Sequence, residues 1–154
     1  MPHTVIVERL IADHPPRQDS LLPVLHAIQT ELGWVPPDAI PAIARALNLS
    51  RAEVHGVISF YHHFRTSPPG RHVVQLCRAE ACQARGAATL ETQALALLGV
   101  DFHGTTADGA ITLEPVYCLG NCACGPSLRV DDAVLGRVDG ARFERLVADL
   151  RKGS

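Results

Sequence analysis

Apolar residues in the first sixty positions recur at helical spacing. The clearest series follows Ser20, falls at intervals of three and four residues, and stops before Gly33: Leu21, Val24, Leu25, Ile28 and Leu32. Such spacing predicts a helix with one apolar face, for which Ser20 is a suitable N-cap and Gly33 a suitable stop. Similar patterns predict a second helix after Pro36 and a third after Ser50, which forms a capping-box sequence with Glu53. The chain before Ser20 has weak periodicity and adjacent prolines, so only a short, partly ordered lead-in is expected there.

The pattern changes after segment 65–70, whose sequence Arg-Thr-Ser-Pro-Pro-Gly contains two prolines and a glycine that cannot continue a helix. We therefore expect two domains, a helical bundle at 1–66 and a second domain at 67–154. The pattern after this break predicts five elements in order: a strand at 72–76, a helix at 86–98, a strand at 111–114, a hairpin at 128–135 and a last helix capped by Asp139. This order predicts an α+β protein, in which a three-helix bundle precedes an α/β layer with a four-stranded sheet.

Composition narrows the classes of function. A chain of 154 residues with 47% apolar content can bury one ordinary core, or one small core with a helical appendage. Charges and prolines interrupt the first thirty residues, so they resemble neither a signal sequence nor a bilayer span, and we expect a cytoplasmic protein. The formal charge of −2 is spread in mixed sign. Because no basic stripe appears, nucleic acid is not an expected partner.

All five cysteines fall in two short segments that each follow a strand-like run. Cys77 and Cys82 form the first segment, and Cys118, Cys122 and Cys124 fall in the second. Cytosolic thiols are kept reduced, so these cysteines are better explained by metal binding or redox chemistry than by disulfides. Loops that leave neighbouring strand ends of an α/β sheet can converge on one edge. We therefore expect the two segments to meet.

Three kinds of site compete for these thiols. A 2Fe-2S cluster needs two thiolates on each iron, which two paired segments can supply. Structural zinc bound by four cysteines has similar spacing and remains open. A thioredoxin-type redox pair needs two residues between its cysteines, and no such pair occurs. The uncharged, glycine-containing stretch 119–126 favours the cluster, because glycine lets backbone N–H groups approach sulfur. Cys124 follows Cys122 too closely to bind the same iron easily, so we expect it to be a small buried thiol.

The motif C-x4-C, thirty-five further residues and then C-L-G-x-C, preceded by Gly-Val-Ile-Ser-Phe-Tyr at 56–61, closely resembles the thioredoxin-like 2Fe-2S ferredoxin family. This family includes the 24-kDa subunit of respiratory complex I and small subunits of NAD-linked hydrogenases and soluble formate dehydrogenases. The resemblance implies a thioredoxin-like second domain. It also implies that Cys77, Cys82, Cys118 and Cys122 ligate one 2Fe-2S cluster.

The resemblance also implies partners. Family members work beside a flavoprotein subunit that holds FMN and the NAD site, with which single electrons are exchanged. Segments 66–73 and 77–83 look most like the gamma subunit of cytosolic, molybdenum-dependent, NAD-linked formate dehydrogenases, which adds a larger catalytic subunit containing molybdenum and iron-sulfur clusters. The alternatives are the equivalent subunit of complex I or of a hydrogenase, or a zinc-stabilised interaction module. Since no hydrolase or phosphate-binding motif occurs, no substrate site is expected in this chain.

Overall fold

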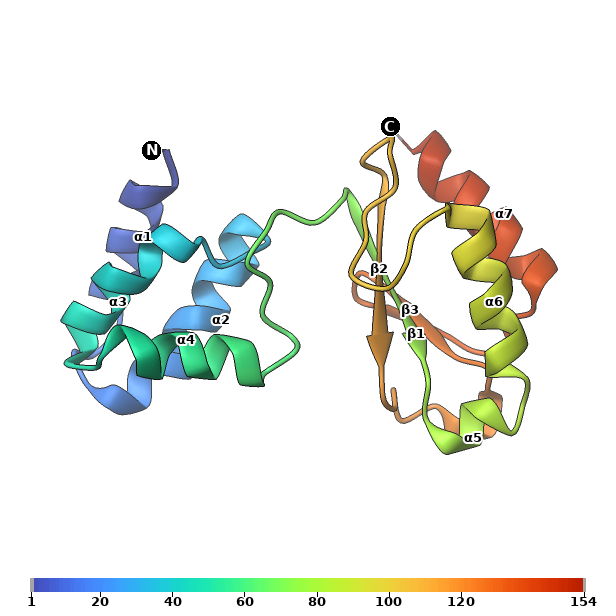
Figure 1. Ribbon diagram of the computed structural model, residues 1–154, viewed down its shortest axis with the longest axis horizontal. Helices are drawn as coiled ribbons and strands as arrows, with labels where there is room; N and C mark the ends of the chain where they lie inside the picture. Colours follow the sequence, from blue (N-terminus) through green and yellow to red (C-terminus); the bar gives the residue numbers. More distant parts are fainter. Residues whose placement is uncertain (1, 154) are drawn as a thin grey trace. The chain divides into compact units, whose positions relative to one another are not determined.

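The computed structural model describes residues 2–153, and the chain divides into two compact units, Met1–Pro68 and Pro69–Ser154 (Figure 1). Each unit is described by itself. No helix within residues 2–153 has both the length and the apolar character needed to cross a membrane. That the chain consists of two domains with a boundary between residues 66 and 67 stays a prediction.

The first unit contains four α-helices: α1 (Pro2–Ala12), α2 (Leu21–Leu32), α3 (Ile40–Leu47) and α4 (Arg51–Phe60). Short 3-10 turns at Gln18–Ser20 and Pro37–Ala39 precede α2 and α3. The apolar faces predicted for the last three helices meet in one core, whose most buried members are at most 1% exposed: Val24, Leu25, Ile28, Ile43, Leu47 and Val54. Packing of these faces holds the bundle together.

Helix α1 is one helix more than the sequence predicted, because it occupies residues that were expected to be a partly ordered lead-in. Its turns bury Val7 and Leu10 in the core of the first unit. An ion pair between Arg9 and Glu31, 2.7 Å apart, also joins α1 to α2. The packed side of α1 carries Ile6, Val7, Leu10 and Ile11, so a helical spacing was present in the sequence and the expectation of a lead-in overlooked it.

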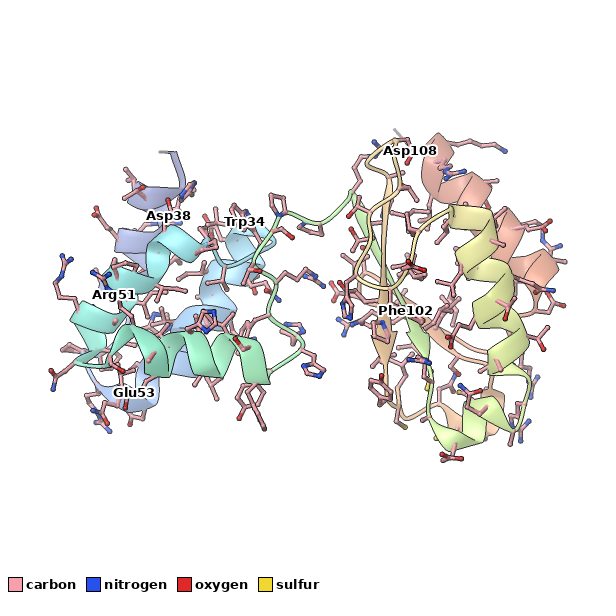
Figure 2. All side chains as sticks on the ribbon, viewed as in Figure 1. Trp34, Asp38, Arg51, Glu53, Phe102 and Asp108 are labelled. Atoms are coloured by element: carbon pink, nitrogen blue, oxygen red, sulfur yellow. The ribbon has the colours of Figure 1, made fainter. Side chains whose placement is uncertain are left out.

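The predicted starts of α2 and α4 are both confirmed, but only α4 has the side-chain cap that the sequence led us to expect. Ser50 accepts a hydrogen bond from the backbone N–H of Glu53, whose carboxylate accepts one from Ser50 N–H, which completes the capping box (Figure 2 labels Glu53). Ser20 makes no capping hydrogen bond. The 3-10 turn Gln18–Ser20 runs directly into α2, so Ser20 already has helical dihedral angles and its side chain is buried.

The second unit is an α/β layer that confirms the predicted class and the order of its main elements. It consists of β1 (His72–Cys77), α5 (Glu80–Gln83), α6 (Ala87–Leu98), β2 (Ile111–Val116), a 3-10 turn at Cys122–Cys124, β3 (Leu128–Val130), β4 (Ala133–Leu135) and α7 (Gly140–Lys152). The four strands lie in the order β2-β1-β3-β4. The short helix α5 was not predicted.

The sheet topology determines where the cysteine segments begin. β1 pairs with β2 in parallel, whereas β3 is antiparallel to both β1 and β4. Helices α5 and α6 connect β1 to β2, and α6 and α7 lie next to each other against the sheet in Figure 1. Leu90, Ala94, Phe143 and Val147 from these two helices are buried with the sheet residues in one core. Because β1 and β2 are adjacent and parallel, their carboxyl ends lie at the same edge of the sheet.

Candidate metal centre

The two cysteine segments leave neighbouring strand ends. Cys77 is the last residue of β1 and lies opposite Val116, the last residue of β2. Cys118 follows two positions after Val116. Because β1 and β2 are adjacent and parallel, both segments start at one edge of the sheet, which is where the ligands of an open α/β sheet are usually found.

The first pair of thiols is buried. Cys77 is 4% exposed and Cys82, which α5 carries, is 2% exposed. Burial raises the pKa of the Cys77 thiol, and the neighbouring Cys82 thiol adds to that rise. The backbone N–H groups of Ala79 and Leu119 partly oppose it. These N–H groups stabilise negative charge on the sulfur whenever Cys77 is a thiolate.

The second pair of thiols is exposed. The Sγ atoms of Cys118 and Cys122 lie 3.6 Å apart. Gly120 has a φ of 73°, which glycine adopts without steric cost, and its N–H donates to Cys118 Sγ over 3.3 Å. This hydrogen bond lowers the pKa of the Cys118 thiol, with a smaller contribution from Cys122. The proximity of Cys118 in turn raises the pKa of Cys122.

The two segments also hold each other in place. Ser127, which is 2% exposed, accepts a hydrogen bond from Cys77 N–H through its carbonyl oxygen. Its hydroxyl group donates to the carbonyl of Asn121 and accepts from the Asn121 side-chain amide. Gly125 packs so closely on the first segment that an added Cβ would lie 3.2 Å from Cys82 Sγ. The loop that carries Cys118 and Cys122 is therefore packed directly on the loop that carries the other pair.

Cys124 is half-buried and is held mainly through its backbone. Its N–H donates to Asn121, and its carbonyl accepts from the N–H of Arg137 over 2.6 Å. Within residues 2–153, the Sγ atoms of Cys118 and Cys122 lie within hydrogen-bonding distance, and Cys82 influences the pKa of Cys77. That Cys124 is not a ligand stays a prediction.

The arrangement of the thiols distinguishes between the two metal sites that the sequence left open. The four thiols form two pairs. Two irons that each take two thiolates match two pairs, whereas one tetrahedral zinc ion needs all four sulfurs around a single point. The donor set therefore fits a two-iron cluster better than zinc.

Comparison with known proteins identifies related sequences along nearly the whole chain. A family model described as thioredoxin-like [2Fe-2S] ferredoxin matches residues 7–151. NADH-quinone oxidoreductase subunit 2 of Thermus thermophilus is 35% identical over 150 residues, which cover 96% of this chain and 83% of that protein. Another NADH-quinone oxidoreductase subunit, from Pseudomonas aeruginosa, is 40% identical over 114 residues, or 74% of this chain and 69% of that one.

Among solved structures, the crystal structure of an NAD+-reducing [NiFe]-hydrogenase in the H2-reduced state has the same fold. It superposes with a TM-score of 0.75 and 23% sequence identity over 90% of this chain. The match spans only 23% of the hydrogenase chain. This likeness supports the arrangement of elements described above.

Proposed function

This chain belongs to the thioredoxin-like [2Fe-2S] ferredoxin family, and we propose that Cys77, Cys82, Cys118 and Cys122 hold its cluster. The observation that carries the assignment is the arrangement of these thiols in two pairs, on interlocked loops at the ends of two adjacent parallel strands. Each pair supplies the two thiolates that one iron requires. Cys124 belongs to neither pair.

When bound, a 2Fe-2S cluster supplies one-electron redox chemistry. The residues of this chain bind it and set its surroundings. The backbone N–H of Gly120 donates to Cys118 Sγ, and the backbone N–H groups of Ala79 and Leu119 act to lower the pKa of Cys77, so both effects favour negative charge on sulfur. Burial of Cys77 and Cys82 opposes that charge, while the exposed Cys118 and Cys122 give a partner its closest approach. Electron transfer needs such an approach and no acid or base of its own.

We further infer that the chain is an electron-transfer subunit of an NAD-linked oxidoreductase, where it exchanges single electrons with a subunit that binds FMN and NAD. The names of its relatives, NADH-quinone oxidoreductase subunits and an NAD+-reducing hydrogenase, support this role. Within that class we propose a cytoplasmic formate dehydrogenase with a larger molybdenum- and iron-sulfur-containing subunit. The sequence resemblance of segments 66–73 and 77–83 supports this choice. The second candidate, the equivalent subunit of complex I or a hydrogenase, is favoured by the relatives' names.

Two measurements test the proposal. The anaerobically purified chain should be brown and contain about two irons and two acid-labile sulfides, whereas a colourless protein with one zinc ion would contradict the cluster and its ligands together. Purification of the native complex then tests the parent enzyme. Molybdenum and formate-dependent NAD reduction in the fraction that contains this chain support formate dehydrogenase. Activity with hydrogen or with a quinone in that fraction, without formate activity, would select the second candidate.

A further inference from the structure

A cavity of about 470 Å³ opens in the second unit beside the cysteine loops. The starts of α6 and α7 and the Gly125-Pro126 segment surround it. Apolar side chains form part of its wall, namely Leu90, Pro126 and Val138, and the wall also carries Arg85 and Arg137. A volume of this order is typical of small-molecule sites.

The two arginines give the cavity a positive charge that is not neutralised by ion pairing within the described chain. None of the ion pairs formed between described residues includes Arg85 or Arg137. One acidic residue, Asp139, also lines the cavity. Its carboxylate accepts a hydrogen bond from Arg142 N–H and so caps α7. The formal charge of the lining is therefore +1, from two arginines and one aspartate.

Hydrogen-bond donors surround these arginines. Gly86, the N-cap of α6, has no side chain to cap the helix, and the N–H groups of the first turn of a helix have no partner within it. Thr89 in that turn adds a hydroxyl group to the cavity wall. Arginine is the side chain best suited to bind phosphate, because its planar guanidinium forms two parallel hydrogen bonds to phosphate oxygens.

We propose that this cavity binds a phosphate monoester, with the phosphate held by Arg85 and Arg137 and the organic part on the apolar wall. Inorganic phosphate carries the same charge but fills only a small part of the volume. Pro126, which is half-buried, supplies apolar wall surface for a carbon skeleton attached to the phosphate, whereas Leu90 and Val138 are at most 3% exposed and contribute little. A monoester uses both features of the cavity.

The cavity adjoins the proposed cluster, so a ligand bound there should also change the reduction potential of the cluster. This expectation rests on the proposed cluster ligands. Gly125 lines the cavity, and a Cβ added there would lie 3.2 Å from Cys82 Sγ and 3.1 Å from Arg85 Cδ. A phosphate bound here adds negative charge close to a ligand sulfur, so it disfavours uptake of an electron. Binding and reduction must affect each other by the same factor. We expect about threefold weaker binding to the reduced protein, equivalent to a potential lowered by about 28 mV at 59 mV per tenfold.

The experiment is calorimetric titration of the cluster-containing protein with phenyl phosphate, phenol and inorganic phosphate at constant ionic strength. Phenyl phosphate should bind, phenol should not, and inorganic phosphate should bind more weakly than the ester. Equal affinity for the ester and for inorganic phosphate would overturn the proposal that the ligand is a monoester and would leave free phosphate as the ligand. No binding of either at millimolar concentration would overturn the site.

Two variants and one control make the assignment specific. Arg137 has a φ of 52°, which asparagine tolerates, so Arg137→Asn removes the guanidinium without adding backbone strain. Arg137→Asn and Arg85→Gln should each weaken binding of the ester about tenfold, the usual scale for a charged hydrogen-bonding partner. The control Arg145→Gln removes the same charge from an exposed position of α7 outside the cavity, and should leave binding unchanged.

The results separate this site from the proposed function. If Arg145→Gln weakens binding of the ester equally, the net charge of the protein alone attracts the phosphate, and the proposal that the ester binds in this cavity is overturned. Ester binding that leaves the reduction potential unchanged would overturn the coupling while the site stands. The ligand assignment of the cluster is judged separately, from iron and sulfide content, and its failure would not alter the calorimetric result.

Discussion

The substitution Ser127→Ala tests whether the two cysteine segments depend on each other. The Ser127 hydroxyl makes two hydrogen bonds with Asn121, of 3.2 and 3.3 Å, and Asn121 lies between Cys118 and Cys122. The carbonyl of the same residue accepts from Cys77 N–H. Removing the hydroxyl should therefore loosen the second segment while the backbone bond to the first remains.

The size of the effect follows from the surroundings of the lost group. Ser127 is 2% exposed, and alanine fills nearly the same volume, so the loss is one of hydrogen bonding without a cavity. The Asn121 carbonyl keeps a second donor, Cys124 N–H, and its half-buried side-chain amide can reach water. Each lost bond then costs near the ordinary net value, and the two together cost about 1–2 kcal/mol. An equilibrium changes by a factor of roughly 5–30 for that energy.

The assay is the rate at which cluster absorbance is lost when the protein is mixed with an excess of iron chelator. If release requires the two segments to open, Ser127→Ala should release iron about 5–30 times faster than the wild type. Ser59→Ala is the matched control, since it deletes the same atom at an exposed position of α4, where the hydroxyl donates to the His55 carbonyl. Its rate should equal that of the wild type. A Ser127→Ala rate within twofold of the control would refute the reasoning.

Three further predictions concern the ligands, the core and acid stability. Cys118→Ser should abolish or destabilise the cluster, whereas Cys124→Ser should leave its visible absorption spectrum nearly unchanged. A Cys124→Ser protein that cannot hold iron would overturn the ligand assignment. Phe143→Ala, at a position 1% exposed in the core of the second unit, should lower the free energy of unfolding by about 3–5 kcal/mol in denaturant titration, with a loss below about 1 kcal/mol contradicting that packing. The pKa of Asp108 is held below its ordinary value of 3.8, chiefly by a hydrogen bond from the Thr106 hydroxyl. The stabilisation that ionised Asp108 contributes to folding is therefore complete above pH 3.8 and is lost as the pH falls through the lowered pKa. Asp108→Asn should accordingly flatten the dependence of the free energy of unfolding on pH below 3.8. An unchanged pH dependence would contradict the role of the Thr106 hydrogen bond.

The sequence was sufficient wherever one local rule determined the structure. Alternation and apolar runs located the four strands, and the capping box located the start of α4. Asp139 caps α7 as predicted, because its side chain accepts from the N–H three residues later. In each case the interacting groups are neighbours in the chain, so their spacing alone defines the contact.

The sequence was insufficient where distant residues decide the structure. Helix α1 is a different case, because Ile6, Val7, Leu10 and Ile11 do follow helical spacing and the signal was overlooked. Ser20 has the residue type of a cap, yet the preceding 3-10 turn makes it part of a helix. Ser127 carried no signal at all, since its role comes from contacts with Asn121 and Cys77, the latter fifty positions earlier in the chain.

The candidate site shows the same division between local and distant information. The spacing of the cysteines was visible in the sequence, but their unequal exposure was not. Cys77 and Cys82 are buried because β1 lies inside the sheet and α5 packs against the loop that carries Cys122, whereas Cys118 follows the edge strand β2 and reaches solvent. The order of the strands thus makes one side of the site protected and the other accessible.

This asymmetry is consistent with electron transfer. In the proposed site, the buried thiols Cys77 and Cys82 would keep water from the metal, and the exposed thiols Cys118 and Cys122 would let a partner's cofactor approach. The donors that point at Cys77 and Cys118 are backbone amides, which do not titrate. Their stabilisation of charge on sulfur is therefore constant across the physiological pH range, and transfer of an electron at this site requires no proton from these groups. A site built in this way needs ligands, amide donors and an open side, and the second unit supplies all three from two strand ends.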